Sequence, residues 1–83
     1  MEKHYIVPII GQVYTNRSGG DYLCTDNKVY EDDEQRQRAL TLGEHWASLK
    51  RIKDGWSLIA HGVIQYADGS IEWNYSTGGR FID

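Results

Sequence analysis

Apolar and polar residues alternate near the end of the chain, a pattern typical of a strand with one buried face. Residues 70–75 (SIEWNY) have a two-residue period, and successive side chains of a strand point to opposite faces. The segment Trp56–Tyr66 is rich in β-branched and aromatic residues and predicts a second strand. Between the two, Asp68 and Gly69 suit the positive φ of a tight turn. These signals predict a β-hairpin whose second strand has an apolar face of Ile71, Trp73 and Tyr75.

The first strand of this hairpin contains a histidine, and the same period predicts its side. Alternation places His61 on the outer face, where we expect it to bond to a neighbouring strand or to water. The alternative is a polar contact within a binding face. Gly62, and Gly11 near the N-terminus, interrupt strand patterns and predict bulges or sharp bends. The residues expected to face the core are Trp56, Leu58, Ala60 and Ile64, and those expected outside with the histidine are Ile59 and Val63.

The N-terminal part repeats this organisation. Residues 5–14 (YIVPIIGQVY) have the composition of a strand. Pro8 within them cannot donate a ladder hydrogen bond and belongs on a sheet edge or at a bulge. The segment 16–20 (NRSGG) predicts a loop, and residues 21–25 (DYLCT) predict a return strand. We therefore expect a second hairpin here.

The middle of the chain is the least regular part. The acidic run at 31–34 (EDDE) precedes Arg36 and Arg38, and early acids with later bases complement a helix dipole. We expect a short helix or an ordered loop that ends near Gly43, followed by a strand at 47–52. The alternative is a helix that continues through this glycine, because helical spacing also relates Ala39, Leu42, Trp46 and Leu49.

These elements predict a mainly β fold, of the β-rich α+β class. Residues 53–55 (KDG) predict the turn into the C-terminal hairpin. The expected architecture is a small antiparallel meander of about five strands with one short helix or ordered loop. The alternative is a sheet that curls into a small SH3-like barrel. A length of 83 residues fits one domain, and 40% hydrophobic residues suffice for a compact core.

Charge and targeting signals narrow the class of protein. The chain has nine Lys and Arg residues and twelve Asp and Glu residues, which gives a net charge of −3. This charge argues against general binding to phosphate backbones. The apolar stretch at the N-terminus is short and has no signal-peptide cleavage pattern. No apolar run approaches the ~20 residues of a membrane span. We expect a soluble cytoplasmic protein with no membrane contact.

Residue types that could carry catalysis are present without a catalytic spacing. Cys24 is the single cysteine, so it cannot form an intrachain disulfide, and no nucleophile motif surrounds it. A zinc site would need about four ligands, usually in close pairs. The candidate ligands, which are scattered, are Cys24, His4, His45, His61 and Asp26. We therefore predict no cofactor and no enzymatic activity, with a zinc site assembled from distant positions as the alternative.

Two glycine-containing loops and one basic cluster could bind anions. The segments 16–20 and 75–80 combine hydroxyls, paired glycines and an arginine, either Arg17 or Arg80. They could form anion-binding nests, although ordinary turn chemistry also explains them. The basic cluster at 50–53 lies between Trp46 and Trp56. This pattern favours, as a second hypothesis, a nucleic-acid or peptide-binding barrel module.

The C-terminal half also resembles a known kind of protein. The pattern GW…AHG…YxDGxIxWxYSTGGxF, with an upstream NRSGG loop, is similar to one in a family of short uncharacterised proteins of bacteriophages and mobile elements. The matching positions run from Gly55 to Phe81, with residues 16–20 upstream. The resemblance brings no assigned activity. It implies a setting in which small proteins bind host machinery, including inhibitors of CRISPR nucleases.

The first hypothesis is therefore a small binding protein that engages a host protein, in the manner of an anti-CRISPR inhibitor of a defence nuclease. Its acidic run could steer it to the basic groove of a nucleic-acid enzyme, and we favour this over direct nucleic-acid binding. The chain could act as a monomer or as a homodimer paired through an edge strand. The candidate partner-binding residues are Tyr14, Arg17, Tyr30, Asp32, Asp33, Glu34, Trp46 and Arg80.

Overall fold

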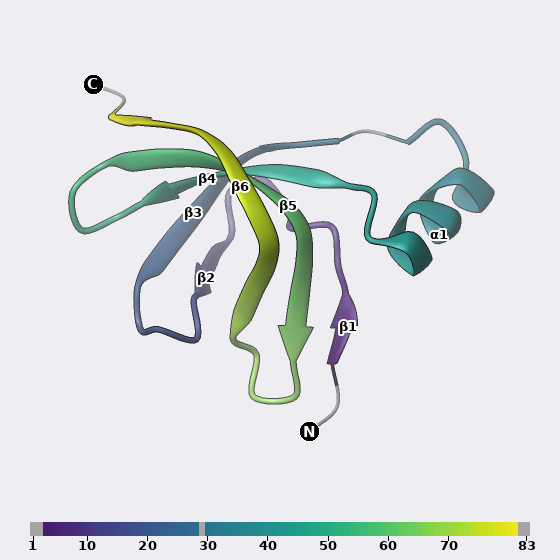
Figure 1. Ribbon diagram of the computed structural model, residues 1–83, viewed down its shortest axis with the longest axis horizontal. Coiled ribbons are helices and arrows are strands. Elements are labelled where there is room, and N and C mark those ends of the chain that lie inside the picture. The colour runs from purple at the N-terminus through teal and green to yellow at the C-terminus, as the bar shows by residue number, and fades with distance from the viewer. Residues whose placement is uncertain (1–2, 29, 82–83) are drawn as a thin grey trace.

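A computed structural model describes residues 3–28 and 30–81 (Figure 1). Within them one antiparallel sheet of six strands is accompanied by one helix, which confirms the mainly β fold. The strands are β1 (Lys3–Tyr5), β2 (Val13–Thr15), β3 (Asp21–Asn27), β4 (Trp46–Arg51), β5 (Trp56–Tyr66) and β6 (Ile71–Phe81), and the helix is α1 (Asp33–Leu42).

Strand β5 organises the sheet. The strand order is β1-β5-β4-β3-β2, and β6 also pairs with β5. Because β6 follows one edge of β5 along most of its length, β4 and β1 occupy the other edge in succession. A single parallel bridge from Asn16 to Ile71 brings the two ends of the sheet together at one corner. The sheet is otherwise open, so the barrel alternative stays a prediction.

The C-terminal hairpin confirms the expected turn but extends further than expected. Gly69 adopts a φ of 88°, and the Ser70 backbone N–H donates to Asp68 Oδ1 over 3.0 Å. The prediction of a loop over residues 75–80 is wrong, because β6 pairs with β5 as far as Phe81. The glycines that suggested a loop accommodate a register shift instead, and Gly78 has a φ of 64°.

The predicted N-terminal strand at 5–14 is also wrong. Only its ends pair, as β1 and β2, with an irregular segment between them. Pro8 lies buried in that segment, and its carbonyl accepts a hydrogen bond from Asn27 Nδ2 over 2.8 Å. Gly11 turns the chain with a φ of 90°. The hairpin of β2 and β3 around the loop at 16–20 is confirmed.

The middle of the chain forms a short helix that ends at Gly43, and neither an ordered loop nor a helix that continues through this glycine. The helix α1 projects beyond the end of the sheet (Figure 1). The Asp32 side chain caps its N-terminus by accepting from the Gln35 backbone N–H over 2.7 Å. Gly43 ends it with a φ of 70°. Trp46 therefore begins β4, and the turn at 53–55 leads from β4 to β5 as predicted.

Removing the helix cap should measurably weaken the fold. We expect Asp32→Ala to lower the free energy of unfolding by about 1 kcal/mol, because it leaves the Gln35 N–H without its side-chain acceptor. Urea denaturation measures the change. Glu31→Ala is the control, because Glu31 is exposed and precedes the cap. A loss as large for the control would contradict the capping role.

The core is built mainly from one face of strands β3, β4 and β5. The paired positions Ala47–Ala60 and Leu49–Leu58 belong to it. Of the ten residues of α1, all described, Ala39 alone is buried, so the helix contributes little to this core. The other buried members are Tyr22, Cys24, Val63 and Ile71, with Ile6, Tyr14, Trp56 and Trp73 packed against them.

The predicted inward and outward sides of β5 are wrong for the residues after Gly62. Val63 is fully buried and Ile64 is not, the reverse of the expected alternation. Gly62 has a φ of 69°, and its backbone N–H donates to the His45 carbonyl over 3.0 Å. A residue with positive φ breaks the two-residue period, so the strand presents the opposite set of side chains beyond it.

Candidate functional site

Strand register places two rows of side chains on the solvent side of β4, β5 and β6. Residues paired across neighbouring strands point to the same side of a sheet. The alternate residues of β4 and β5, such as Leu49 and Ala60, fill the core, so these rows face outward. We call them the outer face. Its first row is Trp46, His61 and Tyr75, and its second row is Ser48, Ile59 and Thr77.

Two residues of the first row, His61 and Tyr75, are joined by ring stacking. The His61 and Tyr75 rings are parallel within 6°, with centroids 4.4 Å apart. A hydrogen bond of 2.9 Å joins His61 Nε2 to Thr77 Oγ1 on β6. This confirms the expectation that His61 bonds to a neighbouring strand. Tyr75 remains 60% exposed, so the row presents an aromatic ring to solvent on a fixed support.

Trp46 separates two hollows on this side of the molecule. One, of about 400 Å³, is lined by Glu44, His61, Asn74 and Tyr75 among others. The other, of about 330 Å³, has the lining residues Asp26, Trp46, Ser48, Ser57, Leu58, Ile59, Gly78 and Arg80. The outer face therefore combines aromatic, apolar and charged groups around one tryptophan.

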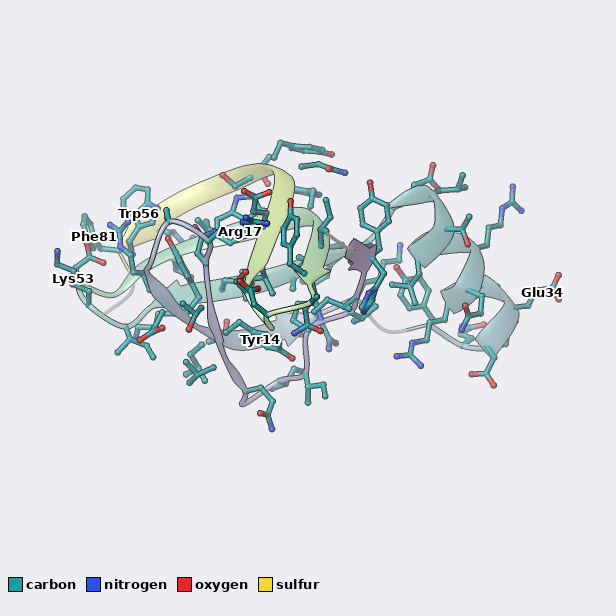
Figure 2. The ribbon with its side chains drawn as sticks, turned by 90° about the horizontal axis from the view of Figure 1, so that it is seen from below. Tyr14, Arg17, Glu34, Lys53, Trp56 and Phe81 are labelled. Atoms are coloured by element: carbon teal, nitrogen blue, oxygen red, sulfur yellow. The ribbon has the colours of Figure 1, made fainter. Side chains whose placement is uncertain are left out.

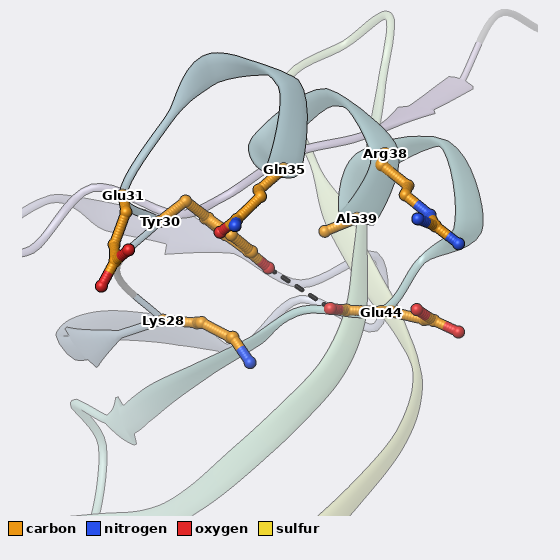
Figure 3. Close-up of a pocket in the computed structure, with 7 residues that line it drawn as sticks. All are labelled: Lys28, Tyr30, Glu31, Gln35, Arg38, Ala39 and Glu44. Carbon is orange, nitrogen blue, oxygen red and sulfur yellow. Dashed lines mark hydrogen bonds between the residues drawn. The ribbon is translucent and has the colours of Figure 1, made fainter.

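A third hollow continues this surface towards the helix. It has a volume of about 470 Å³, and Lys28 and Glu44 line both it and the hollow beside Tyr75. Figure 3 shows the Tyr30 hydroxyl directed at the Glu44 backbone carbonyl, to which it donates over 3.3 Å. Burial, together with the Glu44 carboxylate, raises the pKa of Tyr30, so its hydroxyl stays protonated at neutral pH. The complete lining is Lys28, Tyr30, Glu31, Gln35, Arg38, Ala39 and Glu44.

Three of the predicted partner-binding residues border this continuous surface. Tyr30 and Arg80 each line one of its hollows, and Trp46 lines two. The acidic candidates Asp32, Asp33 and Glu34 form the exposed start of α1. Figure 2 shows Glu34 at the opposite end of the molecule from Phe81. The acidic candidates therefore lie beyond the helix end of the surface, away from Arg80.

The other two candidates lie elsewhere. Tyr14 packs against the core and lines a separate hollow of about 400 Å³ between the N-terminal segment and α1. The Arg17 guanidinium lies 4.0 Å from the centre of the Tyr66 ring. This contact ties the loop at 16–20 to the C-terminal hairpin.

Sequence reasoning missed Tyr75 as a surface residue. The alternation of residues 70–75 predicts that Tyr75 faces inward with Ile71 and Trp73, which is wrong, because it is largely exposed. Its partner in register is His61, which lies just before the bend at Gly62. The glycine in AHG is the signal in the sequence that could have indicated the change of side.

The basic cluster at 50–53 is partly neutralised by its own turn. Arg51 contacts the Asp54 carboxylate through two nitrogens, at 2.8 and 2.6 Å. The hydrogen bond from Arg51 lowers the pKa of Asp54 to about 2. The cluster therefore offers less positive charge to a phosphate backbone than its sequence suggests.

The candidate metal ligands do not converge. The part of the chain that the structure describes has no group of three or more His, Cys, Asp or Glu side chains placed to hold a metal ion. Cys24 is buried, with Sγ 3.4 Å from the Asp26 carbonyl oxygen. Burial raises the pKa of its thiol, which makes the thiolate scarce and the side chain a poor nucleophile.

His45 lies beneath the outer face and is held neutral. It is 2% exposed, and its Nε2 accepts a hydrogen bond from the Val63 backbone N–H over 3.0 Å. That bond places the proton of the neutral ring on Nδ1. Within the described residues Nδ1 has no hydrogen-bond partner. Burial lowers the pKa of His45, because a charged ring would be poorly solvated there.

This histidine should make folding stability fall in mild acid. Its pKa is about 6.5 in the unfolded chain and lower in the fold, so the unfolded state binds more protons as the pH falls below 6.5. We expect the free energy of unfolding of wild type to fall by up to about 1.4 kcal/mol per pH unit between those two pKa values. Above about pH 7.5 this histidine should cause no loss. Urea denaturation across this range measures it.

His45→Gln is the matched variant, because its amide oxygen can still accept from Val63 N–H while the side chain does not titrate. It should lack this acid-dependent loss, and a constant difference in stability between the two proteins does not affect the comparison. Parallel pH profiles for the two proteins would contradict the role of His45.

Comparisons with protein-family models, curated proteins and solved structures found no match. No helix among the described residues has the length and apolar character needed to cross a membrane.

Proposed function

We propose that this chain is a non-enzymatic binding protein that engages a host protein through its outer face. The observation that carries the proposal is the row of Trp46, His61 and Tyr75 across three strands, with an exposed ring and hollows beside it. Tyrosine, tryptophan and arginine are the residues that most often anchor protein interfaces. Arg80 supplies the arginine, at the edge of the hollow on the far side of Trp46.

The chemistry of the surface supports binding rather than turnover. Its charged groups are of both signs, with Lys28 and Arg38 near Glu31 and Glu44, a mixture suited to a polar interface rim. Cys24, the only cysteine of the chain, is buried in the core. A partner could cover the hollows and rings together in an interface of about 800 Å² per side.

The partner class follows from the resemblance to small phage and mobile-element proteins and from charge. The net charge is −3, and the exposed acidic start of α1 would attract a basic surface. We propose a host nucleic-acid enzyme as the partner, with inhibition of a defence nuclease as the outcome and the cytoplasm as the compartment. Binding would occur as a monomer or as a homodimer.

Removal of the exposed ring should weaken partner binding. Affinity capture from host lysate with wild-type protein identifies the partner, whose Kd is then measured for two variants. We expect Tyr75→Ala to weaken binding at least about tenfold, as for an interface anchor. Phe81→Ala is the control: Phe81 is 63% exposed but packs on Trp56 instead, and we expect less than about a twofold change. Equal effects of the two variants, or no saturable partner, would contradict the proposal.

Single-stranded nucleic acid is the second candidate ligand. The observation that favours it lies next to the outer face, where the two cations Lys50 and Arg80 are both paired in register with the buried Ser57. Bases could stack on the aromatic row while these cations contact phosphates. Fluorescence anisotropy of a labelled oligothymidine distinguishes it, because such binding should be detectable at low salt and weaken steeply as salt rises.

A further inference from the structure

The hollow between Trp46 and Tyr75 has the groups that recognise a planar cation. The Tyr75 ring is stacked on His61, and Tyr75 is nevertheless 60% exposed, so it has ring surface that is accessible to a ligand. Glu44 and Asn74, which carry a carboxylate and a side-chain amide, line the same hollow. We propose that this hollow binds the guanidinium group of an arginine on the partner, an inference that rests on the proposed function and names the chemistry it recognises.

A guanidinium group fits these residues for three reasons. It is flat and stacks on aromatic faces, which an ammonium group cannot do. Its fork of donors can reach a carboxylate such as Glu44 and an amide oxygen such as that of Asn74. Its positive charge is attracted by the π-face of Tyr75. The hollow, of about 400 Å³, has room for one long side chain.

The charges around the hollow decide between a guanidinium group and a nucleobase, which would also stack on Tyr75. Lys28 lines the hollow as well, but its Nζ lies 5.9 Å from the centre of the Tyr30 ring, on the side of the neighbouring hollow. A nucleobase brings phosphates, which the net charge of −3 and the acidic residues 31–34 would repel. The same charges attract an arginine-bearing surface.

The test is an NMR titration of the whole chain with three probes: capped tetra-arginine, capped tetra-lysine and oligothymidine of four nucleotides. We expect saturable shifts of the Trp46 indole N–H and the Asn74 side-chain NH₂ with tetra-arginine, and binding about two- to fivefold weaker with tetra-lysine. Tyr75→Leu, which keeps apolar bulk without a ring, and Glu44→Gln should each weaken tetra-arginine binding. Phe81→Leu should not change it, and the dispersion of each spectrum reports that the variant is folded.

Three outcomes would overturn the inference. If tetra-lysine bound as tightly as tetra-arginine, the binding would depend on positive charge alone and not on a guanidinium group. Preferential binding of oligothymidine would assign the hollow to nucleobases. If neither Trp46 nor Asn74 shifted with tetra-arginine, the hollow would not bind a cation. Failure here is separable from failure of the proposed function. If Tyr75→Ala loses the captured partner while tetra-arginine does not bind wild type, the outer face binds a protein by contacts other than an arginine.

Discussion

Replacement of Leu49 by alanine is expected to lower the free energy of unfolding by about 2–5 kcal/mol. The side chain is fully buried and lies between Cys24 of β3 and Leu58 of β5 in the register of the sheet. Truncation removes apolar contacts and leaves a cavity that three paired strands cannot readily close. Domains have about 0.05–0.15 kcal/mol of stability per residue, so a chain of 83 residues would lose a large share of its total. Urea denaturation measures the change.

Ile52→Ala is the matched control for this core substitution. Ile52 immediately follows β4 and is 56% exposed, so its truncation should change stability by less than about 0.5 kcal/mol. If both variants lost the same free energy, Leu49 would not occupy the centre of the core. The inward face of β4 would then need a different register.

The elements that sequence predicts correctly are those fixed by local chemistry. Turns at Gly55 and Gly69 and the helix end at Gly43 all use glycines with positive φ, which other residues rarely adopt. The cap at Asp32 is equally local, because a side chain next to the helix satisfies its free N–H groups, but the acidic run at 31–34 indicated a helix start without singling out this residue. These positions can be recognised without knowing what the rest of the chain does.

The N-terminal segment shows why an apolar run is a weaker signal. Residues 5–14 have the composition of a strand, yet only the ends of this run pair. Pro8 lacks an N–H, and its carbonyl is taken by the side chain of Asn27, which is distant in sequence. Which apolar residues become strands is decided by the partners available in the folded sheet, and a single sequence does not specify those partners.

The candidate site was only partly predictable for a related reason. Trp46 and Arg80 could be chosen by residue type alone, and both border hollows of the outer face. The alignment of Trp46 with His61 and Tyr75 is a matter of register between three strands. Register depends on turn lengths and on the bend at Gly62, which reverses the side on which later residues lie.

Gly62→Ala is expected to destabilise the fold by about 2–4 kcal/mol. The backbone there has a φ of 69°, and a left-handed conformation costs a residue with a Cβ about 1–2 kcal/mol. The added Cβ would also overlap the amide end of Asn74 and lie 2.9 Å from its Cγ. Asn74 would have to move, which breaks the 3.3 Å hydrogen bond that it donates to the Tyr5 hydroxyl. Urea denaturation of the variant gives the total.

Gly69→Ala separates the two causes. Gly69 has a φ of 88° and no atom within 4 Å of the added Cβ, so this variant should show the conformational cost alone, about 1–2 kcal/mol. The excess loss in Gly62→Ala then measures the contact with Asn74, and Asn74→Ala in the Gly62→Ala background should recover most of that excess. If Gly62→Ala cost no more than Gly69→Ala, β5 and β6 would not approach closely at this bend. The positive φ of Gly62 would still account for a loss equal to that of Gly69→Ala. Only a Gly62→Ala variant that lost no stability would remove the bend beside His61 and Tyr75, and with it the structural basis of the exposed aromatic row.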